Sequence, residues 1–187
     1  MTGSFILASA SPRRRELFSL ISPDFKAISA DIDESVFCKL RPRRLAAETS
    51  AAKANAVERG EGDIVVGCDT IVALGRRVFG KPKTREQAVE FLTALSGHTH
   101  AVYTGVTIQA GGRSISFAER TLVTFCKIDR AEIERYADSG EPYDKAGGYG
   151  IQGTAALWTT GIKGCYYNVM GLPVARIRRE LKKAGLV

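Results

Sequence analysis

Blocks of apolar and polar residues alternate along the chain and predict strands and helices in succession. Short runs rich in apolar and β-branched residues, or with two-residue alternation, predict strands. These runs lie at residues 5–8, 25–29, 64–67, 71–74, 101–109 and 113–127. Helices are predicted at residues 12–20, 41–59, 84–95, 129 to about 140, and 173–184, from apolar residues at three- and four-residue spacing or from capping residues at the helix start.

The helix at residues 84–95 has the clearest signals. Thr84 and Gln87 form a capping-box pattern, an apolar face repeats at helical spacing, and Gly97 follows the end. Gly111 and Gly112 join two expected strands, which predicts a hairpin. Residues 144–153 contain four glycines and are expected to form a loop with backbone at positive φ or in close approach to another group.

Composition favours one domain, residues 1–187, in the cytoplasm. The chain has 27 Lys and Arg against 20 Asp and Glu, a net charge of +7, which favours binding to a polyanion. No apolar run is long enough to cross a bilayer, and the start lacks a charged segment ahead of a long apolar stretch. No two of the four cysteines have C-x-x-C spacing, so reduced and mostly buried thiols are expected.

Residues 5–18, FILASASPRRRELF, predict an anion site where a strand enters a helix. Ser11 suits the N-cap and Pro12 the first helical position. The helix dipole and exposed backbone N–H groups then lie beside Arg13, Arg14 and Arg15, an arrangement that suits polyphosphate. The alternative is a solvated basic helix start without a ligand.

Two acidic residues and several basic residues lie in sequence segments that are candidates for a binding site. Glu34 lies in an acidic turn, and Asp69 lies between two apolar runs that we expect to be separate buried strands. Carboxylate oxygens suit Mg²⁺ or Mn²⁺, although an N-cap or a salt bridge is the alternative for either residue alone. Two acidic residues together with the basic residues Arg13, Lys53, Lys81 and Lys145 are the residue types that a phosphoryl-transfer or pyrophosphohydrolase site uses.

The surrounding sequence does not support other known catalytic or binding motifs. The glycines at 148, 150 and 153 match G-x-G-x-x-G but do not follow a strand and open a helix, and the phosphate-binding pattern G-x-x-x-x-G-K-[ST] is absent. His98 and His100 have no third metal ligand near them in sequence, so structural or surface roles are expected. Neither Ser9 nor Ser11 lies in a G-x-S-x-G elbow.

A series of motifs resembles those of the Maf family of nucleoside triphosphate pyrophosphatases, in order and over nearly the whole chain. They are LASASPRRRELF, GCDTIV, GKP, LSGHTHAVYTGV, GEPYDKAGGYGIQG and YYNVMGLP. The resemblance implies an α/β fold like that of the inosine triphosphate pyrophosphatases, with an elongated mixed sheet, flanking helices and a cleft between two lobes. It also implies hydrolysis of a nucleoside triphosphate to the monophosphate and pyrophosphate with a divalent metal, Mg or Mn.

The resemblance also implies roles for particular residues. Asp69 falls on the catalytic proton acceptor and, with Glu34, would hold the metal. The branch that acts on dTTP and UTP has three marker residues, which fall here on Arg13, Thr70 and Gln152. Further polar positions of the family's cleft fall on Ser9, Lys53 and Lys81. One departure is Gly148, where the family more often has alanine, a change expected to loosen the loop without removing a functional group.

Two other classes of function stay open, as does assembly into a homodimer. A basic nucleic-acid-binding module agrees with the charge, but aromatic residues are 8% of the chain and do not interleave with the basic clusters. A regulator of division or septation acting through protein contacts is the second. The basic segment Cys38 to Arg44 matches no motif.

Overall fold

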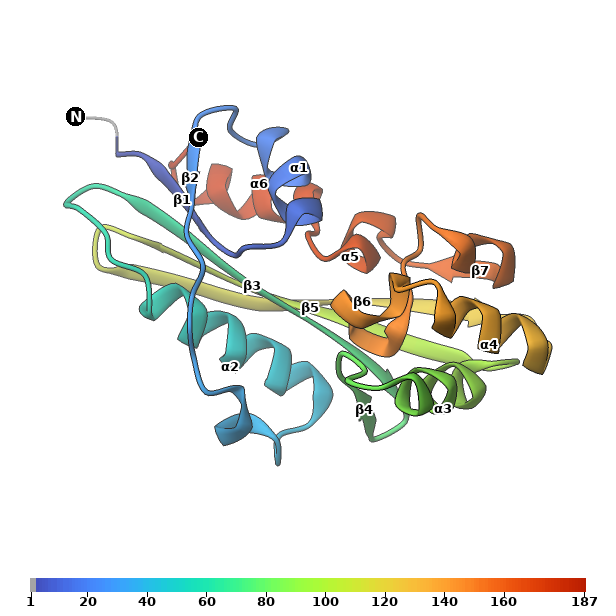
Figure 1. Cartoon of the computed structure of the whole chain (residues 1–187). Helices are drawn as coiled ribbons and strands as arrows, with labels where there is room; N and C mark the ends of the chain where they lie inside the picture. Colours follow the sequence, from blue (N-terminus) through green and yellow to red (C-terminus); the bar gives the residue numbers. More distant parts are fainter. Residues whose placement is uncertain (1–2) are drawn as a thin grey trace. The chain divides into compact units, whose positions relative to one another are not determined.

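The computed structural model describes residues 3–187, which form seven strands of one mixed sheet and the helices around it (Figure 1). The strands are β1 (Phe5–Ala8), β2 (Phe25–Ala27), β3 (Ile64–Leu74), β4 (Arg77–Phe79), β5 (Thr99–Ala110), β6 (Arg113–Phe125) and β7 (Thr159–Lys163). Their order is β2-β1-β3-β5-β6-β7, with β4 paired to β3. The α/β fold with a mixed sheet is therefore confirmed.

Six α-helices and four short 3₁₀ helices complete the described part of the chain. The α-helices are α1 (Pro12–Ser19), α2 (Pro42–Asn55), α3 (Arg85–Leu95), α4 (Arg130–Asp138), α5 (Tyr166–Met170) and α6 (Val174–Lys183). The 3₁₀ helices are η1 (Glu34–Phe37), η2 (Glu141–Asp144), η3 (Ala146–Gly148) and η4 (Thr154–Trp158). None of these helices is long and apolar enough to cross a membrane.

The chain divides into two compact units. Unit 1 contains the residues up to Asp69, together with Thr104–Glu119 and Gly171–Val187, and unit 2 contains Thr70–Tyr103 and Arg120–Met170. Strands β3, β5 and β6 contribute residues to both units. The expected cleft and single domain stay predictions.

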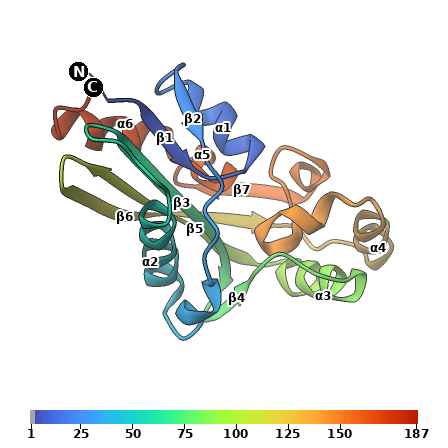
Figure 2. The same cartoon turned by 60° about the vertical axis from the view of Figure 1, so that its left-hand side comes forward.

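In unit 1, β1 pairs in parallel with β2 and β3, and helices cover both faces of these strands. Helix α2 lies on one face, and α1 and α6 lie on the other (Figures 1 and 2). Ile6 and Val65 pack against Ala54 and Val57 in the core beneath α2. Strands covered on both faces are apolar throughout, which explains the continuous apolar runs of β1 and β3.

Two glycines let α2 lie unusually close to the sheet. A Cβ atom at Gly67 of β3 would lie 2.3 Å from the Ser50 carbonyl oxygen, and one at Gly105 of β5 would lie 1.9 Å from that of Ala46. Real side chains do not tolerate such distances, so glycine is required at both positions. This close approach brings the end of α2 beside β3.

In unit 2, α3 and α4 pack side by side, and β7 pairs antiparallel with β6. Aromatic rings fill the core of this unit: Phe125 packs edge-on against His100, Tyr149 and Trp158, and Tyr136 packs against Trp158. The fully buried His100 places Nε2 2.7 Å from the Tyr149 hydroxyl. The structural role expected for this histidine is confirmed.

Three sequence predictions need correction. The runs 64–67 and 71–74 are one continuous strand, β3, because Cys68, Asp69 and Thr70 keep an extended backbone between them. Strands β4 and β7 and helix α5 were not predicted. Of the cysteines, Cys68 is buried but Cys38 is exposed, so the expectation of mostly buried thiols is wrong in part.

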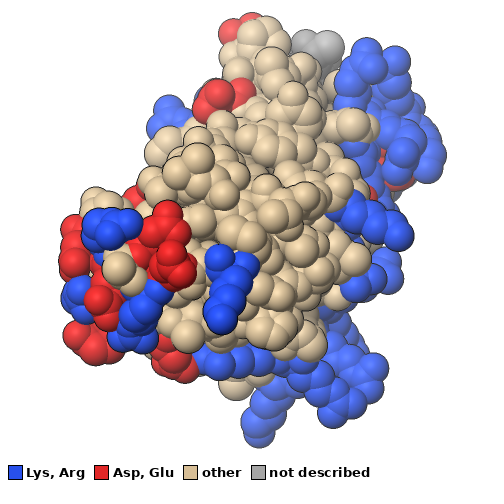
Figure 3. All heavy atoms as spheres, turned by 90° about the vertical axis from the view of Figure 1, so that its right-hand side faces the viewer, with Lys and Arg blue, Asp and Glu red and all other residues tan. Residues whose placement is uncertain are grey.

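Lysine and arginine outnumber acidic side chains on the face shown in Figure 3, in agreement with the net charge.

Burial of His100 predicts that acid destabilises the fold. Desolvation lowers the pKa of His100 from 6.5 to about 4, so the unfolded chain takes up this proton first as the pH falls. The contribution of His100 is therefore complete above pH 6.5 and is lost between pH 6.5 and 4, up to about 3 kcal/mol. Urea unfolding at pH 7 and 4.5 should show a smaller pH dependence for His100→Gln than for wild type. The exposed neighbour provides the control His98→Gln, and equal pH dependence in all three proteins would contradict the prediction.

Candidate active site

The centre of the candidate site is Asp69, on the face of β3 that α2 covers. Side chains alternate along a strand, so Val65, Gly67 and Asp69 share one face. Val65 and Gly67 contact α2, and Asp69 follows two residues later. The Asp69 side chain is 13% exposed, so the carboxylate is held in a largely dry environment beside the helix.

Lys53 of α2 holds two carboxylates at once. Its ammonium Nζ lies 2.6 Å from Asp69 Oδ1 and 2.8 Å from Glu34 Oε1, at the start of η1. Lys53 and Asp69 are largely buried, whereas the Glu34 side chain is 59% exposed. Three residues predicted from different parts of the sequence therefore meet in unit 1.

Burial dominates the proton affinity of Asp69. Desolvation raises the pKa of its carboxyl, and the positive charges of Lys53 and Arg14 oppose this rise only in part. A carboxylate with a raised pKa is a stronger base than an ordinary aspartate, which suits acceptance of a proton from water near neutral pH. Burial also raises the pKa of the adjacent Cys68 thiol to about 11, so this cysteine stays protonated at neutral pH.

The predicted anion site at the start of α1 has the expected cap. Ser11 is the N-cap, its hydroxyl accepts the Arg14 N–H at 3.5 Å, and Pro12 opens the helix. Ser9 is 7% exposed, and its hydroxyl oxygen accepts hydrogen bonds from the Ser11 N–H and from Arg14 Nη1. These two bonds use both oxygen lone pairs, so the Ser9 hydroxyl hydrogen is left as a donor.

The three consecutive arginines differ in their environments. Arg13 and Arg14 are half-buried, and Arg15 is exposed. The Arg14 guanidinium points inward: its Nε donates to the Gly171 carbonyl at 3.0 Å, and its Nη1 donates to the Cys68 carbonyl at 2.9 Å and to Ser9 Oγ at 3.2 Å. Arg14 was not singled out from its neighbours by the sequence, because a run of three arginines does not show which one faces the sheet.

The other predicted residues belong to unit 2. Thr70 is half-buried on β3, whereas Lys81 and Gln152 are exposed. The glycine loop packs beside Lys81: the Gly147 N–H donates to the Gly80 carbonyl at 2.9 Å, and Gly148 lies against Pro82. Gly147 and Gly148 both have positive φ, as expected for this loop. In unit 2, the structure therefore brings the loop that carries Gln152 next to the Lys81 segment.

Lys145, a further predicted cation, is engaged within its own loop. Its Nζ donates to the Glu141 carbonyl at 2.7 Å and to Asp144 Oδ1 at 2.6 Å. A Cβ atom at Gly150 would lie 2.8 Å from Lys145 Cε, and one at Gly153 would lie 2.1 Å from Glu141 Oε1, so both distances are too short for a side chain. Lys145 therefore helps to shape the loop that presents Gln152.

The chemistry of Glu34 and Asp69 suits a divalent cation. Both carboxylates already converge on one cation, the Lys53 ammonium, and oxygen donors are the ligands that Mg²⁺ and Mn²⁺ prefer. Within residues 3–187 no group of three or more His, Cys, Asp or Glu side chains is arranged to hold a metal. Two protein carboxylates complemented by substrate phosphate oxygens and water are a common magnesium arrangement.

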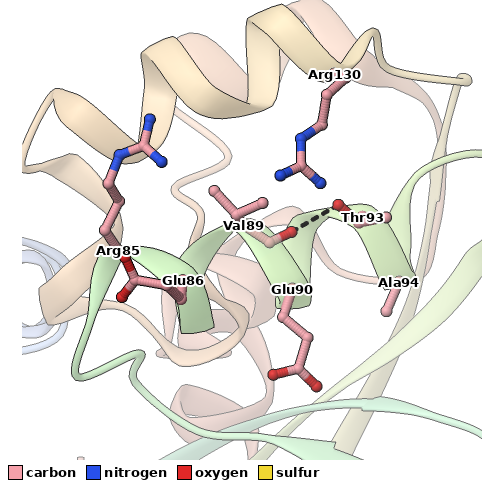
Figure 4. A pocket seen from close by; sticks show the side chains of 7 residues that line it. All are labelled: Arg85, Glu86, Val89, Glu90, Thr93, Ala94 and Arg130. Atoms are coloured by element: carbon pink, nitrogen blue, oxygen red, sulfur yellow. Dashed lines mark hydrogen bonds between the residues drawn. The ribbon is translucent and has the colours of Figure 1, made fainter.

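Two hollows in the described surface are lined by none of the predicted site residues. One, of about 470 Å³, lies in unit 2 between α3 and the start of α4, with Val89 at its floor and Arg85 and Arg130 at its sides (Figure 4). These arginines pair with Asp138 at 2.6 Å and Glu134 at 2.5 Å. The second, of about 740 Å³ in unit 1, is mainly apolar and includes Phe5, Ile64 and Leu186. The concentration of charge around Asp69, and not the volume of a hollow, identifies the candidate active site.

Comparisons with known proteins agree with the motifs and with the fold. The chain is 46% identical over 179 residues to a dTTP/UTP pyrophosphatase of Bacillus cereus, covering 95% of this chain and 94% of the relative. It is also 46% identical over 180 residues to a dTTP/UTP pyrophosphatase of Bacillus cytotoxicus, covering 96% and 94%. The solved structure of a HAM1 protein from Coxiella burnetii has a similar fold, with a TM-score of 0.52 and 12% identity over 97% of this chain and all of that one. The family model described as "Maf-like protein" matches residues 4–184, and the chain therefore belongs to the Maf family.

Proposed function

We propose that this protein is a nucleoside triphosphate pyrophosphatase that hydrolyses dTTP and UTP to the monophosphate and pyrophosphate. The observation that carries the proposal is the buried Asp69 carboxylate, which has a raised pKa and lies 2.6 Å from the Lys53 ammonium. The high identity to relatives named dTTP/UTP pyrophosphatase supports the choice of substrates. Because nucleoside triphosphates are made and used there, we place this activity in the cytoplasm.

In the proposed reaction, Asp69 is the general base. It accepts a proton from water as the water oxygen forms a bond to the α-phosphorus. The bond from the α-phosphorus to the bridging oxygen breaks, and pyrophosphate leaves with that electron pair. Because Lys53 already contacts Oδ1, Oδ2 is the oxygen that we assign to the proton.

Cationic and donor groups would stabilise the negative charge that moves onto the leaving pyrophosphate. We assign this role to Lys53, Arg13 and Lys81, and we assign to the Ser9 hydroxyl a hydrogen bond to a phosphate oxygen. A divalent Mg or Mn ion, held by Glu34 and Asp69, would supply further charge neutralisation when bound. Thr70 and Gln152 would distinguish the pyrimidine substrates from other nucleotides, as the family motifs imply.

The proposal is tested with a panel of nucleotides. Purified protein is incubated with Mg²⁺ or Mn²⁺ and with dTTP, UTP, CTP, GTP or modified pyrimidine triphosphates, and pyrophosphate and orthophosphate are measured separately. We expect pyrophosphate release, fastest from dTTP and UTP. Release of orthophosphate alone, or binding of duplex DNA without hydrolysis of any triphosphate, would reject the proposal.

Gln152→Ala is expected to change base selection. An amide side chain offers both a donor and an acceptor, which matches the imide edge of uracil or thymine. Loss of this pairing should lower kcat/KM for UTP and dTTP by about 10- to 100-fold and affect GTP much less. Steady-state kinetics on four nucleotides, with the exposed Thr154→Ala as a control in the same region, would test this. A uniform decrease for all four would show that Gln152 shapes the loop and does not read the base.

A further inference from the structure

The Arg14 guanidinium connects three separate segments of unit 1. Its acceptors are the Ser9 hydroxyl after β1, the Cys68 carbonyl in β3 and the Gly171 carbonyl before α6. We propose that Arg14 is a positioning residue of the active site, which holds Ser9 and the peptide group preceding Asp69 in the geometry that hydrolysis requires. The inference rests on the proposed function and adds a residue to it.

The bond to Cys68 compensates for the end of a strand pair. Strand β1 pairs with β3 as far as Ala8, opposite Gly67, and there β1 ends. The Ile64 N–H donates to the Ser4 carbonyl. In a parallel pair, every second residue directs both its N–H and its carbonyl to the same neighbouring strand. Ile64 faces β1, and Cys68 lies four residues later, so the Cys68 carbonyl also faces the β1 side.

Without Arg14, the Cys68 carbonyl would lie beyond the last β1 partner on its side. A buried carbonyl without a partner is costly, so the backbone would move to find one. Asp69 follows in the chain immediately, and a shift of this peptide would move its carboxylate away from its position beside Lys53. A displacement of about 1 Å in a catalytic group can reduce turnover by about a hundredfold.

The same guanidinium orients Ser9. Arg14 Nη1 and the Ser11 N–H both donate to Ser9 Oγ, at 3.2 and 3.3 Å, so the hydroxyl can only donate to a further partner. A phosphate oxygen of the substrate is the partner that the proposed function supplies. The hydrogen bond from Arg14 Nε to the Gly171 carbonyl fixes the orientation of the guanidinium group. The positions of Ser9 and Cys68 therefore both depend on this one rigid, planar group.

The positive charge of Arg14 provides a separate readout. It is one of the charges that lower the pKa of Asp69 against the opposing effect of burial. Removal of the charge should therefore raise the pKa of Asp69 further and shift the acid limb of the kcat/KM profile to higher pH.

The test compares Arg14→Gln and Arg14→Lys with the exposed neighbour Arg15→Gln. Kinetics on dTTP and UTP are measured from pH 5 to 9, and thermal unfolding shows that each variant is folded. We expect Arg14→Gln to lower kcat by about a hundredfold, with KM changed less than about threefold. Its acid limb should move to higher pH, whereas Arg15→Gln should behave like wild type.

Arg14→Lys separates charge from geometry. It should restore the acid limb toward that of wild type but leave kcat reduced by about tenfold or more, because an ammonium group cannot reproduce the planar fork. A folded Arg14→Gln with normal kcat and an unchanged acid limb would overturn the proposal. An increase in KM alone would also overturn it, because Arg14 would then bind substrate without positioning Asp69 or Ser9.

A direct spectroscopic measurement distinguishes failure of this inference from failure of the proposed function. If wild type releases no pyrophosphate from any nucleotide, the proposed function fails. The backbone ¹³C carbonyl resonance of Cys68 and the ¹⁵N–¹H resonance of Asp69 are then compared in wild type and Arg14→Gln. A change in both resonances supports the link between Arg14 and the peptide before Asp69, and unchanged resonances reject it.

Discussion

Asp69→Asn is expected to lower kcat/KM for dTTP and UTP by at least about a hundredfold, the lower range for loss of a general base. Asparagine keeps the shape of the side chain but loses its charge and basicity. The wild-type profile should fall as the pH decreases through the raised pKa of Asp69, because protonation removes the base. Steady-state kinetics at saturating metal, with pyrophosphate as the measured product, would show both effects.

The exposed Asp24→Asn is the matched control and should have wild-type activity, since it makes the same chemical change on the surface and outside the predicted motifs. Thermal unfolding of Asp69→Asn should be close to wild type, because the neutral amide removes the desolvation cost of the buried carboxylate and so offsets the lost ion pair with Lys53. A folded Asp69→Asn with near-normal turnover would exclude Asp69 from the chemistry.

Lys53→Met is expected to have the second-largest effect, in both activity and stability. Methionine keeps most of the length and apolar character of the side chain but leaves two carboxylates without their shared cation. We expect kcat/KM to fall by at least about a hundredfold, the cost of removing one strong electrostatic stabiliser. The free energy of unfolding should fall by about 2 kcal/mol at pH 8, less than for a fully buried pair because Asp69 can take up a proton.

The loss of stability in Lys53→Met should be smaller at low pH than at high pH. Without Lys53 the pKa of Asp69 rises further above its unfolded value, so the folded state binds more protons than the unfolded state. Stability of the variant should therefore recover relative to wild type as the pH falls through that raised pKa. Urea unfolding at pH 8 and pH 5.5 measures this difference, and an equal deficit at both would contradict it.

Glu34→Gln serves as the comparison for stability, because Lys53 keeps its buried partner and Glu34 is largely exposed. Its free energy of unfolding should change by less than about 1 kcal/mol, as is usual for an exposed ion pair. A larger loss of stability in Glu34→Gln than in Lys53→Met would reverse the assignment of Asp69 as the partner that matters.

Local signals in the sequence determined much of the fold and most of the candidate site. Ser11 and Pro12 begin α1 as predicted, and Thr84 caps α3 by accepting the Gln87 N–H at 3.2 Å. Gly147 and Gly148 adopt positive φ. These features depend on the chemistry of a few adjacent residues, so they can be read without tertiary contacts. The order of the motifs also predicted the family, which the family model confirms.

Only the tertiary structure showed that Asp69 lies buried within one continuous strand. A charged residue between apolar runs suggested a break, but β3 continues because Lys53 of α2 supplies a countercharge to the buried carboxylate. That pairing depends on the close approach of α2 at Gly67. No local pattern contains this information, since the stabilising partner lies 16 residues away in sequence.

The choice among three adjacent arginines was likewise made by packing. Successive helical residues point about 100° apart, so Arg13, Arg14 and Arg15 cannot face the same neighbours. Only the placement of α1 against β1, β3 and the segment before α6 directs Arg14 toward Ser9, Cys68 and Gly171. The sequence by itself determined that positive charge gathers at this helix start, and the tertiary structure decided which arginine meets the carbonyl next to Asp69, because hydrogen-bond geometry depends on the register of elements distant in the chain.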